Sequence, residues 1–124
     1  MNLPEMTTSA PAINFPELME RVENDRDLLN DLLEMFRDEF PRQRQLLEDA
    51  VKSEDMKQIY ATGHTLKGIL ANLAMSRAAR AAAEIEQAGK ENNIVGIKTA
   101  IATLDEEAAD IFAELNADGM DATA

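Results

Sequence analysis

The sequence predicts an all-α protein, an antiparallel up-down four-helix bundle with a short additional N-terminal helix. Apolar residues recur at three- and four-residue spacing along most of the 124-residue chain. No stretch shows the alternating, β-branched pattern that is typical of a strand. Because the long helical segments are joined by short turns, consecutive helices are expected to lie antiparallel to each other.

The chain divides into one domain and two ends. Residues 1–12 contain two prolines and a Thr-Thr-Ser run without periodic apolar residues, so we expect a disordered tail or linker there. The helical bundle is expected over residues 13–116. Residues 117–124 are expected to form a frayed C-terminal tail.

Capping residues predict where the first two helices begin. Asn14, followed by Pro16 in the first turn, predicts a short helix that ends near Val22. A longer helix is expected to start after Asn24 or Asp25, since either side chain can cap it.

The apolar residues of this longer helix follow a helical period. They are Leu29, Leu32, Leu33, Phe36, Phe40, Leu47 and Val51. Pro41 lies among them and lacks a backbone N–H, so we expect a kink or a local break at this position.

Two further helices are predicted from serine caps and a glycine. Ser53 is expected to start a helix that runs to about Met75. Ser76 is expected to cap the next helix, which would end at Gly89 because glycine commonly follows the last helical residue.

The last helix, from about Asn93 to Leu115, keeps a strict three–four alternation of apolar residues. These are Ile94, Ile97, Ile101, Leu104, Ala108, Ile111 and Leu115. The same seam occurs in coiled-coil oligomers. We favour a monomeric bundle, because each helix is amphipathic and the turns are short.

Composition excludes several classes of function. A net charge of −12 argues against binding a nucleic-acid backbone or an anionic membrane surface. With no cysteine and one histidine, there is no disulfide framework, thiolate zinc site or two-histidine metal site. No apolar run is long enough to span a membrane, and no signal-peptide pattern opens the chain. We therefore expect an acidic cytoplasmic protein.

The chain's one histidine, His64, is predicted to face solvent. At about 100° per residue, Leu66, Ile69 and Leu73 lie on the opposite side of the helix, which is the side expected to face the core. The residues that surround the histidine on the helical wheel are Lys57, Tyr60, Ala61, Lys67, Gly68, Ala71 and Met75.

These neighbours suit a histidine that carries a charged group. Gly68 leaves room beside the imidazole, and a glycine inside a helix costs about 1 kcal/mol that some gain must offset. Lys67 lies one turn away, where its charge can neutralise a phosphoryl group on the ring. The alternative is an ordinary surface histidine beside a solvated lysine. The residues that offer a low, partly apolar surface for a docking protein are Tyr60, Ala61, Ala71 and Met75.

The run His64-Thr65-Leu66-Lys67-Gly68, followed by Leu73 and by Ile85-Glu86, resembles the histidine-containing phosphotransfer (HPt) domain family. That family has His-x-Leu-Lys-Gly, then Leu or Phe nine residues after the histidine, then a Leu-Glu-like pair on the next helix. The resemblance covers about Phe15 to Leu115. It departs at Ala74, where the family usually has a second glycine.

The resemblance implies that His64 accepts a phosphoryl group from a receiver-domain phosphoaspartate and passes it to another receiver. Lys67 would steady the phosphoryl oxygens, Gly68 would give access, and Glu86 would orient the imidazole. For Glu86, an ordinary exposed helix charge is the alternative. Lys57 and Lys90 would join the docking surface.

The same resemblance implies a carrier protein without kinase activity of its own, which acts on response-regulator receivers or a hybrid histidine kinase. It would need no cofactor, because the Mg²⁺ belongs to the receiver partner. Two alternatives remain open here. One is the phosphoacceptor domain of a chemotaxis-type histidine kinase, and the other is a helical adaptor with a degenerate HPt fold that is not phosphorylated.

Overall fold

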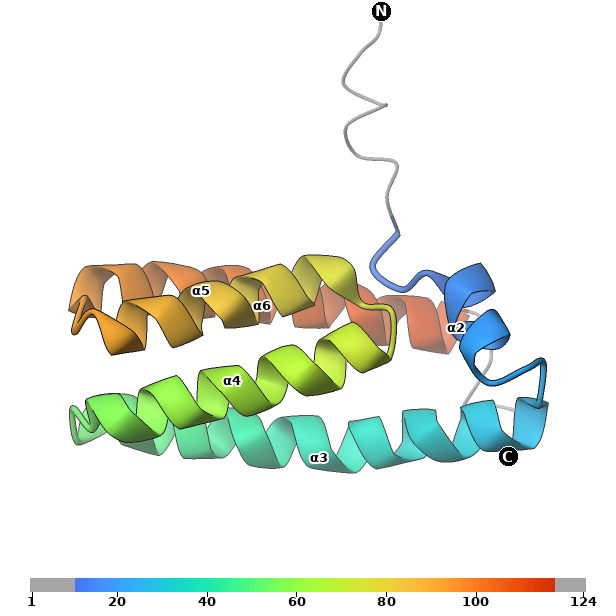
Figure 1. Cartoon of the computed structure of the whole chain (residues 1–124), viewed down its shortest axis with the longest axis horizontal. Helices are drawn as coiled ribbons and strands as arrows, with labels where there is room; N and C mark the ends of the chain where they lie inside the picture. Colours follow the sequence, from blue (N-terminus) through green and yellow to red (C-terminus); the bar gives the residue numbers. More distant parts are fainter. Residues whose placement is uncertain (1–10, 118–124) are drawn as a thin grey trace, which may run out of the picture.

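Within residues 11–117, which the structure describes, four long helices pack side by side and a short helix crosses one end of them (Figure 1). The structure is a computed structural model. In chain order the helices are α2 (Phe15–Arg21), α3 (Arg26–Lys52), α4 (Met56–Asn72), α5 (Ser76–Lys90) and α6 (Ile94–Ala117). The all-α fold class is confirmed. Of the tails predicted at residues 1–12 and 117–124, residues 1–10 and 118–124 lie outside the described residues, and Ala117 is the last residue of α6.

Side-chain caps begin four of these helices, and that of α6 is Asn93, whose side-chain oxygen accepts from the N–H of Gly96 at 2.9 Å. The side chain of Asn14 accepts from the backbone N–H of Glu17, and that of Asp25 accepts from the N–H of Leu28, as the sequence predicts for α2 and α3. The cap of α4 is Asp55.

Two predicted serine caps are wrong. Ser53 ends α3 instead of starting α4, since its backbone N–H bonds the carbonyl of Asp49. Ser76 is already the first residue of α5, and Met75 before it caps the helix without a side-chain hydrogen bond. Both turns use a residue with positive φ, Glu54 or Ala74. Helix α4 starts at Met56, later than Ser53 suggests, whereas α5 starts at Ser76 itself, earlier than a cap at Ser76 would place it.

The break expected at Pro41 does not occur, because α3 continues through it (Figure 1). Pro41 is exposed, so its ring lies on the outer side of the helix and not in the core. On the inner side of the same turn, the rings of Phe36 and Phe40 lie 5.5 Å apart, and Phe36 stacks on Phe112 of α6 at 5.4 Å. This aromatic cluster packs the middle of α3, just before Pro41, against α6.

The apolar seam of α6 is buried inside the chain. Ile97, Leu104, Ile111 and Leu115 are fully buried, and they pack into one core with residues from the other helices. A seam that is covered by its own chain stabilises the bundle without a second copy.

The N-terminal segment ties the end of the bundle together. The carboxylate of Glu114 on α6 accepts from the backbone N–H groups of Ala12, at 2.7 Å, and Ile13, at 3.0 Å. Both residues are buried, and the N–H of Asn14 bonds the carbonyl of Ala74 in the α4–α5 turn. Ala12, predicted to belong to the tail, is thus part of the folded core.

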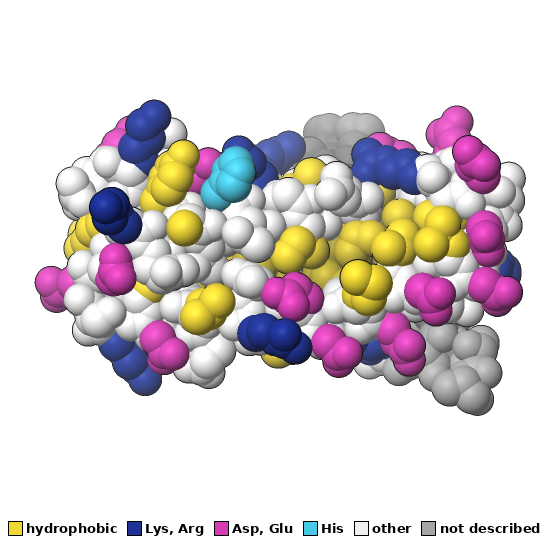
Figure 2. All heavy atoms as spheres, turned by 60° about the horizontal axis from the view of Figure 1, so that its bottom comes forward, with side chains coloured by type: hydrophobic (Ala, Val, Ile, Leu, Met, Phe, Trp, Pro, Cys, Tyr) yellow, Lys and Arg dark blue, Asp and Glu magenta, His cyan; other side chains and the backbone are white. Residues whose placement is uncertain are grey.

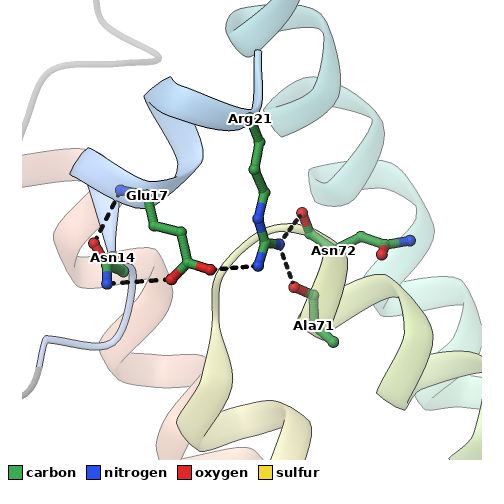
Figure 3. A network of polar contacts seen from close by, with 5 residues as sticks. All are labelled: Asn14, Glu17, Arg21, Ala71 and Asn72. Carbon is green, nitrogen blue, oxygen red and sulfur yellow. Dashed lines mark hydrogen bonds and ion pairs between the residues drawn. The ribbon is translucent and has the colours of Figure 1, made fainter. Parts of the chain in front are cut away.

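Helix α2 also caps the C-terminus of α4. The guanidinium of Arg21 donates to the carbonyls of Ala71, at 2.7 Å, and Asn72, at 2.9 Å, and it pairs with Glu17 (Figure 3). The last carbonyls of a helix lack partners within it, so a cation that binds them stabilises the helix end.

Replacing Glu54 by glycine is expected to stabilise the protein by about 0.5–1 kcal/mol. Glu54 has φ 54° in the α3–α4 turn, a conformation that costs an ordinary residue about 1–2 kcal/mol. Glycine avoids this cost, and the gain exceeds the free energy lost because glycine has more conformational entropy in the unfolded state. Thermal unfolding should show a midpoint a few degrees higher. The control is Glu54→Ala, which removes the same charge but keeps the strain; an equal gain for both variants would contradict the argument.

Candidate functional site

His64 projects from the middle of α4 into solvent. Its side chain is 64% exposed, whereas Ile59 and Leu66 on the other side of the helix are fully buried. The amphipathic pattern of α4 therefore places the chain's one histidine on the outer surface, and Figure 2 shows it there (cyan).

Helix α5 brings one carboxylate to this histidine. Oε2 of Glu86 lies 2.9 Å from Nδ1 of His64, and Oε1 of Glu86 lies 2.7 Å from Nζ of Lys67. The side chain of Glu86 is only 14% exposed, so it sits between α4 and α5 and is not a freely solvated helix charge. The three side chains His64, Glu86 and Lys67 thus form a connected triad.

The charge state of Glu86 determines which nitrogen of the ring is free. The hydrogen bond from Lys67, and secondly that from His64, holds the pKa of Glu86 below its ordinary value, although burial acts in the opposite direction. An ionised carboxylate only accepts hydrogen bonds, so Nδ1 of His64 carries the proton. In the neutral ring the lone pair is then on Nε2, which makes Nε2 the nucleophile.

Tyr60, one turn before the histidine on α4, places its ring beside the imidazole. The rings of Tyr60 and His64 are 6.5 Å apart between centroids and nearly parallel, at 16°. Tyr60 is 41% exposed, so it offers an apolar surface to a partner as well as to the imidazole.

Gly68 leaves the surface beside His64 open. A Cβ built at Gly68 would have no atom within 4 Å, so no contact inside this chain requires a glycine there. Since glycine costs about 1 kcal/mol in a helix, the space fits a group that comes from outside.

Most of the predicted docking residues are exposed, but Met75 is not. Lys57, Ala61, Ala71 and Lys90 lie at the surface. Met75 is fully buried, and its predicted place on the docking surface is wrong. The reason is that α4 ends at Asn72 and the turn, with φ 58° at Ala74, directs Met75 into the core.

An apolar groove lies between α3 and α4. The helical pattern assigns Leu32 and Ile69 to the core, yet both are only partly buried, and Met35 is 64% exposed. Figure 2 shows hydrophobic side chains gathered in a band on the face that carries the histidine. The residues that line the groove are Leu32, Met35, Phe36, Glu39, Ile69, Asn72 and Leu73.

Gly89 is buried in the last turn of α5, which ends at Lys90, one residue after the predicted end. A Cβ at this position would be 3.0 Å from the backbone nitrogen of Tyr60, so glycine serves close packing of α5 on α4. A glycine that packs and a glycine that ends a helix look the same in one sequence. The sequence argument also passes over Gly63, which faces α5 in the same way.

Two kinds of site are not found among residues 11–117. No group of three or more His, Asp or Glu side chains is placed to hold a metal ion. None of the helices there is both long and apolar enough to cross a membrane.

The site is thus a solvent-facing histidine on a helical bundle, hydrogen-bonded through Nδ1 to a carboxylate and close to a lysine. Residues 31–114 match the Hpt domain family, and the chain belongs to that family. Hpt domains take part in phosphotransfer of two-component signalling, where they interact with receiver domains. No curated protein and no solved structure shows significant similarity to the chain.

Proposed function

We propose that this protein is a phosphorelay carrier that accepts a phosphoryl group on His64 from the phosphoaspartate of one receiver domain and passes it to another. The observation that carries the proposal is the hydrogen bond of Nδ1 to Glu86, at 2.9 Å, in a ring that is 64% exposed. This bond keeps the proton on Nδ1 and leaves Nε2 free to meet a partner's active site.

In the transfer, one phosphorus–nitrogen bond forms while one phosphorus–oxygen bond breaks. The lone pair of Nε2 attacks phosphorus, the bond from phosphorus to the aspartyl oxygen breaks, and its electron pair stays on the receiver's carboxylate. No proton has to move, because Nδ1 already carries one. The ring becomes cationic as the new bond forms, and the carboxylate of Glu86 stabilises this charge. The reverse sequence passes the group to the next receiver.

Lys67 and Gly68 act on the phosphoryl group itself. Nζ of Lys67 uses one of its three donors on Glu86, at 2.7 Å, and has others to offer to phosphoryl oxygens. Gly68 keeps the approach to the ring open. Mg²⁺ and the acid residues that bind it belong to the receiver, so this chain acts as a carrier and not as a kinase.

The receiver docks on the face around His64. Its centre is low, because Ala61 and Ala71 project little, and the groove between α3 and α4 beside it offers exposed apolar surface for a helix of the receiver. On the other side, Lys57 and Lys90 lie with Tyr60 around a shallow depression, where they can meet the acid residues of a receiver.

The test is transfer of label from a ³²P-phosphorylated receiver domain to the purified chain. We expect label that is lost in acid and stable in base, as phosphohistidine is, and no label on His64→Gln. Thr65→Ala, a change at the exposed neighbouring residue, should be labelled like the wild type. Label that persists on His64→Gln would refute the site, and no label from a panel of receivers would favour a helical adaptor.

A further inference from the structure

Gly63, the residue before the histidine, touches the backbone of the residue that binds the histidine. A Cβ built at Gly63 would lie 2.8 Å from the backbone nitrogen of Glu86, 3.0 Å from its Cα and 3.2 Å from Cγ2 of Ile85. Backbone atoms of a helix cannot rotate away as a side chain does. A methyl group here would therefore force α4 and α5 apart.

The second glycine near His64 behaves differently. Gly68 lies on the same helix, and a Cβ there would meet nothing within 4 Å. Glycine thus occupies these two positions of α4 for different structural reasons. Gly68 clears space on the outside, and Gly63 allows close approach on the inside.

We propose that Gly63 is a positioning residue, which sets the distance between α4 and α5 so that the carboxylate of Glu86 reaches His64. An ordinary contact to a Cβ needs about 3.4 Å or more, so alanine at this position would displace Glu86 by about half an ångström. The bond from Nδ1 of His64 to Glu86 is 2.9 Å long, and such a displacement takes it beyond the normal range of hydrogen bonds.

Gly89 provides the matched comparison. A Cβ there would lie 3.0 Å from the nitrogen of Tyr60 and 3.2 Å from Cγ2 of Ile59, which is a similar contact in the same α4–α5 interface. It is one turn away from the pair of His64 and Glu86, and the atoms of α4 nearest to its Cβ belong to Tyr60 and Ile59. General loosening of the interface would affect both glycines alike, whereas positioning of Glu86 depends on Gly63.

The first experiment uses the unphosphorylated protein. Because His64 is the only histidine, its imidazole ¹⁵N signals are assigned without ambiguity. At about pH 9, where an imidazole is neutral, these signals report which ring nitrogen carries the proton. We expect the Nδ1–H form in the wild type, Gly68→Ala and Gly89→Ala, and a mixture of both tautomers in Gly63→Ala.

The second experiment measures transfer and rests on the proposed function. Gly63→Ala should slow phosphorylation of His64 by about 10-fold or more in the wild-type background, by analogy with the loss of the hydrogen-bond partner of a metal-binding histidine. In a Glu86→Ala background the same change should have no further effect on the rate, since the bond that it disturbs is already absent.

The two experiments separate the inference from the proposed function. An unchanged Nδ1–H tautomer in Gly63→Ala, or an equal shift in Gly89→Ala, overturns the positioning role even if His64 is phosphorylated. A shifted tautomer supports it even if no receiver labels the chain. If Gly63→Ala is partly unfolded, its spectrum is recorded with trimethylamine N-oxide, which favours the compact state, and the same outcomes apply.

Discussion

Replacing Glu86 by alanine is expected to slow phosphorylation of His64 by about 10- to 100-fold, by analogy with the loss of the hydrogen-bond partner of a metal-binding histidine. In the structure this carboxylate lies 2.9 Å from Nδ1 and is ionised beside Lys67. Without it the proton is no longer held on Nδ1, and no anion balances the ring as it becomes cationic. The rate is measured in single turnover with an excess of phosphorylated receiver.

Two further variants separate the contributions of Glu86. Glu86→Gln keeps an oxygen that can accept a hydrogen bond from Nδ1 but removes the charge. Its rate of phosphorylation should therefore lie between those of the wild type and Glu86→Ala. Glu84→Ala, an exposed change on the same helix, should leave the rate unchanged. A rate for Glu86→Ala within twofold of the wild type would show that the acid does not assist transfer.

Replacing Glu114 by alanine is expected to lower the free energy of unfolding by about 2–3 kcal/mol. Its carboxylate accepts from the N–H groups of Ala12, at 2.7 Å, and Ile13, at 3.0 Å, in a buried segment. Hydrogen bonds to a charged acceptor contribute about 1.5–3 kcal/mol each, and detachment of the segment relieves part of the loss. Urea denaturation gives the free energy, and hydrogen exchange at both amides shows whether the segment detaches.

The control for this change lies on the same helix. Glu106 is exposed on α6, and Glu106→Ala should stay within about 0.5 kcal/mol of the wild type, as most surface substitutions do. If Glu114→Ala also stays in that range, the two backbone bonds contribute nothing to stability, and the N-terminal segment is held by its apolar contacts alone.

The sequence predicts the fold well because long periodic segments determine which face of each helix is buried. Ile97, Leu104 and Ile111 recur at helical spacing and are all fully buried. The same reasoning identifies His64 as a surface residue, because Leu66 and Ile59 define the opposite face of α4. Helix periodicity is local, so it can be read without knowledge of the turns.

What depends on the turns is harder to predict. Met75 lies on the surface if α4 is extended past Asn72, but the turn at Ala74 sends it into the core. The residue types here do not predict this turn, since alanine rarely adopts a positive φ. The contacts of Glu86 with His64 and Lys67 likewise depend on how α5 packs on α4. The family resemblance suggests the contact with His64, but a helical wheel describes one helix and cannot predict a contact between two.

The contacts of the N-terminal segment determine where an expressed fragment of this domain should begin. The region that matches the Hpt family starts at residue 31, which is inside α3. A fragment cloned from that residue would begin with a helix that lacks its first turn and its cap, Asp25. It would also lose Arg21, which caps the end of α4 eight residues beyond His64. An expression boundary before Ala12 keeps all of these contacts.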